Sequence, residues 1–356
     1  MVTRSWVVEA PGKMVLRQFP VPAVAEDGML VRVEMVGICG SDPTMFKGHI
    51  PTTPLPLILG HEMAGRVEKV GAEASRAYGV KEGDRVTVEP YRICGRCIYC
   101  LQGRYQMCKT RSCYGVTIGC AEPPHLFGAY GEFLYVAPGS KIHKLRPEDP
   151  AEHGMLSSVI GNGVRWIRSR AQVQMYEGVV IIGPGAQGLA AVIAAKESGA
   201  NPILVTGLAR DERRLALARE YGADRTVMVD MEDAAKAVRD LIGPQGADVV
   251  VETSGSTPGR NFALEIVRPV GRVVIVGVKG GPDPDLTVDT LIFKELQVLG
   301  GLGQAWDVEP AMRIIQSGKY DLGKMVTHRF PMSKADEALH FFMEHPEECL
   351  RVALIP

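Results

Sequence analysis

The stretch that decides the fold of the second half of the chain runs from Val179 to Ala200 and reads VVIIGPGAQGLAAVIAAKESGA. Four β-branched apolar residues precede a G-x-G-x-x-G turn, and an alanine-rich segment of helical length follows it. A strand, a glycine turn and a helix in this order form a dinucleotide-binding fingerprint, in which the helix N-terminus receives the phosphates. The residues that we expect at the cofactor phosphates are Gly183, Gly185, Ala186, Gln187 and Gly188.

Apolar strands alternate with helix-length segments after this fingerprint. The stretches PILVTG, RLALAREYGA, DVVVETSG and GRVVIVG follow one another between residues 202 and 277. Buried strands that alternate with helices indicate an α/β fold, with a doubly wound parallel sheet covered by helices on both faces. Up to about residue 145 the chain reads instead as short strands broken by glycine and proline, which indicates a β-rich domain.

The last part of the chain predicts a return to that first domain. EPAMRIIQSGK and SKADEALHFFMEH have helical patterns, VTHRF reads as a strand, and the final RVALIP is of β type. We therefore expect three segments, with bounds at 1–158, 159–299 and 300–356.

Length and charge limit the possible functions. The chain has 356 residues, 46% of them hydrophobic, with 40 Lys and Arg against 41 Asp and Glu. This is the profile of a globular protein of about two domains. A net charge of −1 gives no attraction for nucleic acid or for an anionic membrane. The sequence contains no apolar run of the roughly 18–20 residues that a membrane span needs, and it predicts a cytoplasmic protein.

Four of the eight cysteines fall within one short loop. Cys94, Cys97, Cys100 and Cys108 supply four thiolates with no open position, which is typical of a structural zinc site. An iron–sulfur cluster is the alternative, but its last cysteine is normally followed by proline, and Lys109 stands there. We predict that zinc clamps a loop with too few apolar residues to fold alone.

The choice between NAD and NADP, which differ by a 2′-phosphate, is harder to predict. An NAD site expects an acid at the end of the second strand, but this strand ends in Thr206 and Gly207. Arg210 and two further arginines follow, and guanidinium groups suit a 2′-phosphate. Asp211 could instead reach the ribose. The pattern predicts NAD(P) and slightly favours NADP.

A second group of metal-binding residue types lies near the start. Gly37–Asp42 reads GICGSD, and about twenty residues later Gly60, His61 and Glu62 follow. With the four-cysteine loop, the glycine fingerprint, GDRV at 83–86, GAD at 222–224 and VTHRF at 326–330, the chain resembles the zinc-dependent medium-chain alcohol and polyol dehydrogenases nearly end to end. Within that family it is most similar to sorbitol, threonine and hydroxycamphor-type dehydrogenases.

The resemblance implies an architecture. It implies a GroES-like catalytic domain over residues 1–158 with a structural zinc loop at 94–108, a Rossmann domain over 159–299, and a return to the catalytic domain over 300–356. It also implies a homodimer or homotetramer joined at the edge of the Rossmann sheet. The stretch 285–293, DLTVDTLIF, could be the strand at that edge.

The resemblance further implies a catalytic zinc bound by Cys39 and His61, with Glu62 as an acid able to approach the metal. Ser41 corresponds to the hydroxyl that carries the alcohol proton toward solvent. A zinc ion with an open position lowers the pKa of a bound alcohol, so that a hydride can leave for the nicotinamide. The expected substrate is a small molecule, a secondary alcohol or polyol and its ketone or aldehyde. Thr44 stands where the family usually has a second relay residue, histidine.

The third zinc ligand departs from the family pattern. The expected Cys, Asp or Glu aligns with Ser158, and serine is a poor zinc ligand. Glu62 could bind the metal directly, or Glu132, Glu152 or His153 could supply the third bond. Otherwise zinc is weak or absent, and the protein is a zinc-independent enone or quinone reductase of the same superfamily. A third possibility is a non-catalytic dinucleotide sensor.

Further cofactor contacts are carried over from the family. Ligands bind outside the carboxyl ends of such strands, which agrees with most of these positions. The residues are Thr253 and Ser254 at one strand end, Val276, Gly277 and Val278 at the nicotinamide, and Arg351 near the pyrophosphate.

Overall fold

The computed structural model describes residues 1–50, 52–278 and 285–356, and the chain divides into two compact units. The first unit comprises residues 1–158 and 321–356, and the second comprises residues 159–320. In the described parts of the chain, no helix combines the length and the apolar character that crossing a bilayer requires.

The return to the first unit lies later than the sequence predicts. The expected boundary at residue 300 is wrong, because the first unit resumes at Asp321. Helix α11 (Val308–Gln316) belongs to the second unit, where it buries one apolar face. Just before this helix, Asp307 forms a buried ion pair with Arg165 at 3.2 Å, which ties the segment to the second unit.

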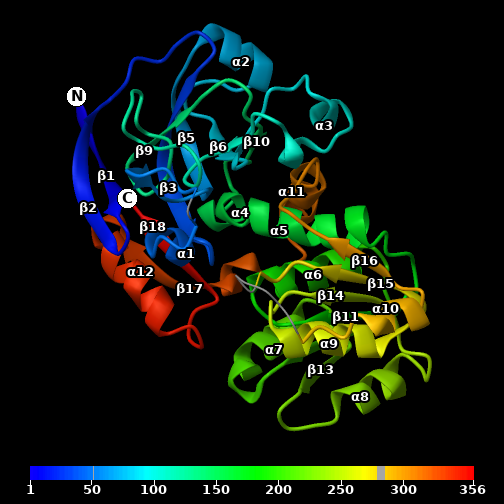
Figure 1. Cartoon of the computed structure of the whole chain (residues 1–356). Helices are drawn as coiled ribbons and strands as arrows, with labels where there is room; N and C mark the ends of the chain where they lie inside the picture. Colours follow the sequence, from blue (N-terminus) through cyan, green and yellow to red (C-terminus); the bar gives the residue numbers. More distant parts are fainter. Residues whose placement is uncertain (51, 279–284) are drawn as a thin grey trace. The chain divides into compact units, whose positions relative to one another are not determined.

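The first unit consists of β-sheets joined by short helices (Figure 1). Strands β1 and β2 form a hairpin extended by β4, strands β7 and β8 form a separate pair, and the large sheet has the order β10-β6-β5-β3-β18-β17, with β9 also paired to β3. The strands are β1 Val2–Ala10, β2 Lys13–Pro20, β3 Met29–Ile38, β4 Leu57–Ile58, β5 Glu62–Val70, β6 Arg85–Val88, β7 Tyr91–Arg92, β8 Ser112–Cys113, β9 Phe133–Val136, β10 Ile142–Lys144, β17 Val326–Pro331 and β18 Arg351–Ile355.

Burial of the long strands builds the core of this unit. Strand β3 buries nearly all of its residues, because strands pair with it on both edges and helices cover its sheet. The helical segments are α1 Asp42–Phe46, α2 Ala72–Tyr78, α3 Ile98–Leu101, η1 Tyr105–Met107, α4 Ala151–Met155, η4 Leu322–Met325, η5 Met332–Lys334 and α12 Ala335–Glu344.

Strand register brings distant parts of the sequence together at one end of the large sheet. Gly37 pairs with Glu62 across β3 and β5, and Val352 pairs with Ile38 across β18 and β3. Cys39 follows directly on β3, and Arg351 opens β18. The ends of these three strands therefore carry the polar groups described below.

The second unit is a six-stranded, fully parallel sheet of order β13-β12-β11-β14-β15-β16 (Figure 1). Strands β12 and β13 lie on one side of β11 and strands β14, β15 and β16 on the other, so the order reverses between β11 and β14. Doubly wound sheets bind ligands at such a switch point. The predicted α/β fold is confirmed. The strands are β11 Val179–Ile182, β12 Ile203–Gly207, β13 Arg225–Met228, β14 Ala247–Glu252, β15 Val267–Ile275 and β16 Gln297–Gly300.

Helices connect these strands. One expectation is wrong here: the stretch 285–293 contributes helix α10 and not a strand, and the edge strand is β16. The helical segments are α5 Ser157–Val164, which leads from the first unit into the second, the π-helical Arg165–Arg170, α6 Ala186–Glu197, η3 Ala209–Asp211, α7 Glu212–Glu220, α8 Ala234–Leu241, α9 Thr257–Ile266, α10 Asp289–Phe293 and α11.

Candidate active site and metal centres

The structure brings together a thiol, an imidazole and a carboxylate at the end of the large sheet. Ligand atoms of Cys39, His61 and Glu62 all lie within 4.8 Å of one another. Sulfur, imidazole nitrogen and carboxylate oxygen are the donors that zinc takes in proteins, and three protein ligands leave a fourth position for water or substrate. The arrangement fits a catalytic zinc.

The electrostatics of this group favour a cation. Burial alone would lower the pKa of His61, but Cys39, and then Asp42 and Glu62, raise it to about 10. Two buried polar atoms of the group, His61 Nδ1 and Glu62 Oε2, have no hydrogen-bond partner among the described residues. A site that holds positive charge so strongly and leaves such atoms unpaired is suited to a metal ion.

Asp42 stands behind His61. Its carboxylate is fully buried, and Oδ1 lies 3.6 Å from His61 Nδ1. The other oxygen, Oδ2, accepts hydrogen bonds from the backbone N–H of Cys39 at 2.8 Å and from the hydroxyl of Tyr130 at 3.0 Å. Metal-binding histidines are commonly oriented by such a carboxylate. Asp42 lies within the GICGSD stretch, so the sequence contained a signal for it, whereas no local signal indicated Tyr130.

Arg351 lies against the same group. It is buried, its Nη2 donates to Glu62 Oε1 at 3.1 Å, and its Nη1 donates to the carbonyl of Ile38 at 3.3 Å. The guanidinium therefore balances the charge of Glu62 within the first unit. The contact with the cofactor pyrophosphate that the family implies stays a prediction.

The other candidates for the third zinc ligand are engaged elsewhere. Glu132 accepts from Thr3 and Arg4, and Glu152 accepts from Arg329 at 2.8 Å. Neither carboxylate belongs to the group around His61 in the part of the chain that the structure describes. Glu62 is thus the acid that the geometry offers to a metal.

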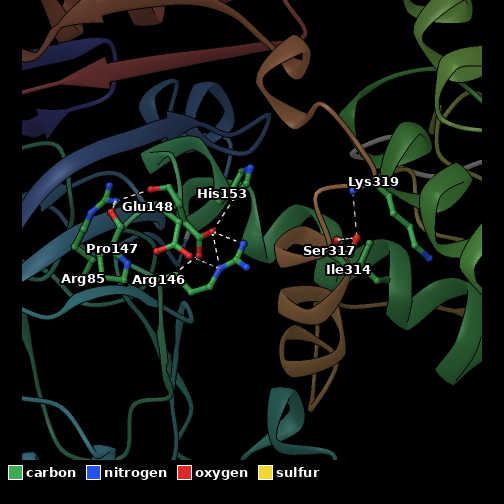
Figure 2. A network of polar contacts seen from close by, with 9 residues as sticks. Arg85, Arg146, Pro147, Glu148, His153, Ile314, Ser317 and Lys319 are labelled. Atoms are coloured by element: carbon green, nitrogen blue, oxygen red, sulfur yellow. Dashed lines mark hydrogen bonds and ion pairs between the residues drawn. The ribbon is translucent and has the colours of Figure 1, made fainter.

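His153 belongs to a separate polar network (Figure 2). Its Nδ1 lies 3.7 Å from Asp149 Oδ1, which also accepts from the guanidinium of Arg146 at 2.7 Å. Arg85 donates to backbone carbonyls at Pro147 and Asp149 in the same network. These contacts fix the chain before and within α4. Ser158, at the aligned ligand position, is buried.

Ser41 occupies the N-cap position of α1 and is only partly buried. Its side chain makes no capping hydrogen bond to that helix. The hydroxyl is therefore not used for capping, and the proton-carrying role that the family implies remains open to it. Thr44 lies one turn further in the same helix.

The four cysteines of the loop form a compact sulfur cluster. Their sulfur atoms lie within 4.8 Å of one another, with 3.6 Å between Cys97 and Cys100 and between Cys94 and Cys108. A tetrahedral site with Zn–S bonds of about 2.3 Å has sulfur–sulfur edges of about 3.8 Å. Backbone N–H groups of Arg96 and Cys97 lower the pKa of Cys94 to about 6, which favours the thiolate. The cluster fits a structural zinc.

The glycine fingerprint in the second unit has the expected local geometry. Gly183 adopts φ +97°, a conformation that favours glycine. A Cβ at Gly188 would lie 1.9 Å from the carbonyl oxygen of Gly183, whereas a Cβ at Gly185 would meet nothing within 4 Å. The turn is therefore tight on one side and open at the start of α6. Asn162, which the sequence analysis missed, donates to Gln187 at 3.3 Å.

The neighbouring strand ends are held by a buried acid. The Thr253 hydroxyl donates to the carbonyls of Ile182 and Gly183, and the carboxylate of Glu252 accepts from the backbone N–H groups of Ser254 and Gly255. Burial raises the pKa of Glu252. These side chains shape the loops and do not point freely outward.

The nicotinamide positions lie after β15. The backbone N–H groups of Val276 and Gly277 donate to the carbonyl of Glu252, and Val278 is 89% exposed. The first two positions are thus fixed by the backbone of the adjacent strand end, and the third is open. Their contact with nicotinamide stays a prediction.

Two aspartates accept hydrogen bonds from the backbone of the loop after β12. Asp211 is buried, accepts from the N–H of Leu208 and pairs with Arg214 at 2.8 Å. Asp230, which sequence reasoning missed because it lies beyond the next strand, accepts from the N–H of Ala209 at 2.9 Å. Arg210 is exposed beside them. Asp211 is therefore occupied as a local cap and not directed at a ribose.

Comparisons with known proteins agree with this geometry. Residues 25–147 match the alcohol dehydrogenase GroES-like domain, and residues 186–317 match the zinc-binding dehydrogenase domain. The chain is 35% identical to a "probable alcohol dehydrogenase" of Mycobacterium tuberculosis over 95% of this chain and 94% of the relative. It is 32% identical to the D-arabitol-phosphate dehydrogenase of Enterococcus avium, with coverage of 95% and 94%.

Solved structures show the same fold. An alcohol dehydrogenase from Thermotoga maritima superposes with a TM-score of 0.90 at 28% identity over the full length of both chains. A zinc-binding dehydrogenase from Sinorhizobium meliloti bound to NADP superposes with a TM-score of 0.87 at 25% identity, again over both full lengths. The fold and the two sets of zinc donors define an oxidoreductase that acts on CH–OH groups with NAD(P). The chain belongs to the zinc-dependent medium-chain alcohol dehydrogenase family.

Proposed function

We propose that the protein interconverts a secondary alcohol or polyol and its ketone or aldehyde, with catalysis centred on Cys39, His61 and Glu62. The observation that carries this proposal is the convergence of three zinc donors at the end of the large sheet, where Glu62 Oε2 is buried with no hydrogen-bond partner among the described residues. A zinc ion bound there supplies Lewis acidity to the substrate oxygen. The relative named D-arabitol-phosphate dehydrogenase supports the substrate class.

The chain's own residues have distinct tasks in this proposal. Cys39, His61 and Glu62 hold the metal, and Arg351 offsets the charge of Glu62 through its 3.1 Å contact. The Ser41 hydroxyl, which makes no capping bond, accepts the proton of the alcohol and passes it to water. Thr44 has no titratable group, so the histidine relay of the family is absent at this position.

The zinc-independent reductase is disfavoured by the same residues. A reductase that works without a catalytic metal does not need a buried thiol, imidazole and carboxylate whose ligand atoms lie within 4.8 Å of one another. The alternative predicts one zinc per chain, held by the four cysteines. The proposed function predicts two.

The test is the zinc content of purified protein, measured with the wild type and Cys39→Ser in parallel. We expect two zinc ions per chain in the wild type and one in the variant, together with loss of alcohol oxidation across a panel of secondary alcohols, diols and sugar alcohols. One zinc in both proteins would overturn the proposal.

We further propose that NADP is the preferred cofactor. Gly207 offers no carboxylate to a ribose, Asp211 is engaged with Leu208 and Arg214, and the exposed Arg210 lies next to this strand end. The S. meliloti neighbour bound to NADP is consistent with this choice. Asp230 opposes it, because a second carboxylate near Ala209 repels a phosphate.

Arg210→Ala tests the cofactor proposal. We expect kcat/KM for NADP to fall at least tenfold and that for NAD to change little, since only NADP carries the 2′-phosphate. A wild type that uses NAD at least as well as NADP would contradict the proposal. It would then assign the discrimination to Asp230.

Assembly and location also stay predictions. The exposed side chains of Ile292, Phe293 and Val298 lie on α10 and β16 at the edge of the parallel sheet, which supports a homodimer or homotetramer formed there. A monomer at micromolar concentration in sedimentation would contradict this. A cytoplasmic location is consistent with eight cysteines that form no disulfide in the structure.

A further inference from the structure

Tyr130 reaches the candidate zinc group from outside it. The side chain is completely buried, and its hydroxyl donates to Asp42 Oδ2 at 3.0 Å across 88 residues of sequence. Burial and the neighbouring Asp42 raise the pKa of Tyr130 well above its ordinary value, so the hydroxyl remains a donor. Among the described residues, the Tyr130 hydroxyl donates to Asp42 and to none of the three donor side chains, so it acts on them through Asp42.

Asp42 has two oxygens with different environments. Oδ2 is fixed by two donors, the N–H of Cys39 and the hydroxyl of Tyr130. Oδ1 has no hydrogen-bond partner among the described residues and lies 3.6 Å from His61 Nδ1. A carboxylate that is held at one oxygen presents the other in a fixed direction, and here that direction is the imidazole.

We propose that Tyr130 is a positioning residue for the catalytic metal, because its hydroxyl holds Asp42 in the orientation that aims His61 toward Cys39 and Glu62. The inference rests on the proposed function and adds to it a residue outside the ligand set. Tyr130 touches neither substrate nor cofactor in this account, and it acts only through Asp42.

The backbone supports the same conclusion. Tyr130 N–H donates to the carbonyl of Leu59 at 2.9 Å, two residues before His61. The ring lies under Gly60, where an added Cβ would come within 2.5 Å of the ring atom Cδ1. One residue therefore fixes the chain that leads into His61 and, through its hydroxyl, the carboxylate behind the imidazole. Phenylalanine would preserve the ring contact and remove only the hydroxyl.

The deciding variant is thus Tyr130→Phe, and the chain offers a matched control. Tyr114 is buried in the same unit, and its hydroxyl contacts Ser140 at 2.6 Å and the N–H of Ala137 at 2.8 Å. Tyr114 belongs to neither group of zinc donors. Tyr114→Phe therefore measures the cost of losing a buried hydroxyl in this unit without any effect on Asp42.

The experiment titrates each protein with a zinc chelator and follows zinc content and cobalt spectra. Outer-shell partners of metal ligands typically contribute about 10–100-fold to metal affinity. We expect Tyr130→Phe to weaken the more labile zinc at least tenfold and to alter the absorption of cobalt bound at that site. Tyr114→Phe should bind zinc and cobalt at both sites as the wild type does. The zinc of the four cysteines serves as an internal reference in every sample.

A second variant tests the route. Asp42→Asn alone should weaken the same zinc, and adding Tyr130→Phe to it should change the affinity less than twofold, since the hydroxyl then has no carboxylate to hold. A full tenfold loss on top of Asp42→Asn would overturn the route through Asp42. If Asp42→Asn does not fold, the comparison of the two tyrosine variants decides alone.

The failures are distinguishable. A wild type with two zinc ions and a Tyr130→Phe variant of equal zinc affinity would overturn this inference and leave the proposed function standing. Equal weakening in both tyrosine variants would also overturn it, because a general loss of stability would then explain the result. A wild type with one zinc would overturn both proposals.

Discussion

Alanine at two glycines of the fingerprint should separate the packing of the second unit from its binding of the cofactor. An ideal Cβ at Gly188 would lie 1.9 Å from the carbonyl oxygen of Gly183, whereas ordinary carbon–oxygen contacts are about 3.3 Å or longer. Helix α6 would have to move away from β11 by about 1.4 Å. Overpacking of this kind costs about 1–3 kcal/mol, so Gly188→Ala should unfold at a temperature several degrees lower.

Gly185 is the matched control. Its added Cβ meets no atom within 4 Å, and its φ of −67° and ψ of 177° are accessible to alanine. Gly185 is the N-cap of α6, where alanine is less favourable by roughly 0.5–1 kcal/mol. The methyl group would, however, stand where the pyrophosphate is expected. Gly185→Ala should keep nearly all of its stability and lose cofactor affinity by about tenfold or more.

The assay combines thermal unfolding of cofactor-free protein with calorimetric titration of NADP and NAD. Gly188→Ala should lose both stability and affinity, and Gly185→Ala mainly affinity, with a loss of stability no larger than the roughly 0.5–1 kcal/mol of the N-cap. Wild-type affinity in Gly185→Ala would show that no ligand approaches the backbone at that position. Wild-type unfolding of Gly188→Ala would refute the packing argument for the third glycine.

Three further predictions concern the metal centres and the acids near them. Cys97→Ser should lower the melting temperature by several degrees and release one zinc, because the loop around α3 has few apolar contacts of its own; an unchanged melting temperature would contradict a structural metal. Glu62→Gln should lose the catalytic zinc and Glu152→Gln should keep it, as zinc analysis of the two variants would show; the reverse result would make Glu152 the third ligand. Although burial alone would raise the pKa of Glu152, Arg329 lowers it below its ordinary value, so the stability that this pair adds is present above about pH 4.5 and is lost as the pH falls through the lowered pKa. Arg329→Ala should therefore cost up to about 1 kcal/mol of unfolding free energy at pH 7 and less than that at pH 3, in denaturant titrations at both pH values; an equal cost at both would contradict the ion pair.

Much of the fold could be predicted from the sequence, because its signals are local. The glycine turn between residues 183 and 188 identified the Rossmann unit, VTHRF became β17, SKADEALHFFMEH contains α12, and RVALIP contains β18. The segment 285–293 failed because a short apolar run has no clear period, and Asp289 in its first turn suits the positive end of a helix.

Only part of the candidate site could be predicted from the sequence, because only part of it has local signals. Cys39, His61 and Glu62 lie close to glycines in the sequence, and this pattern indicates a metal-binding or catalytic role for them. Tyr130 and Arg351 show no such mark, since their contacts with Asp42 and Glu62 join segments that lie 88 and 289 residues apart in the sequence. Local periodicity cannot encode pairings of that length.

The position of β18 has a consequence for biosynthesis. Arg351 opens this strand, and the strand follows the whole second unit in the sequence. A ribosome must therefore translate the entire nucleotide-binding unit before the partner of Glu62 exists. The four-cysteine loop, in contrast, is complete by residue 108. The nascent chain can thus acquire its structural zinc early, while the neighbourhood of the second metal is finished only after the whole second unit has been synthesised.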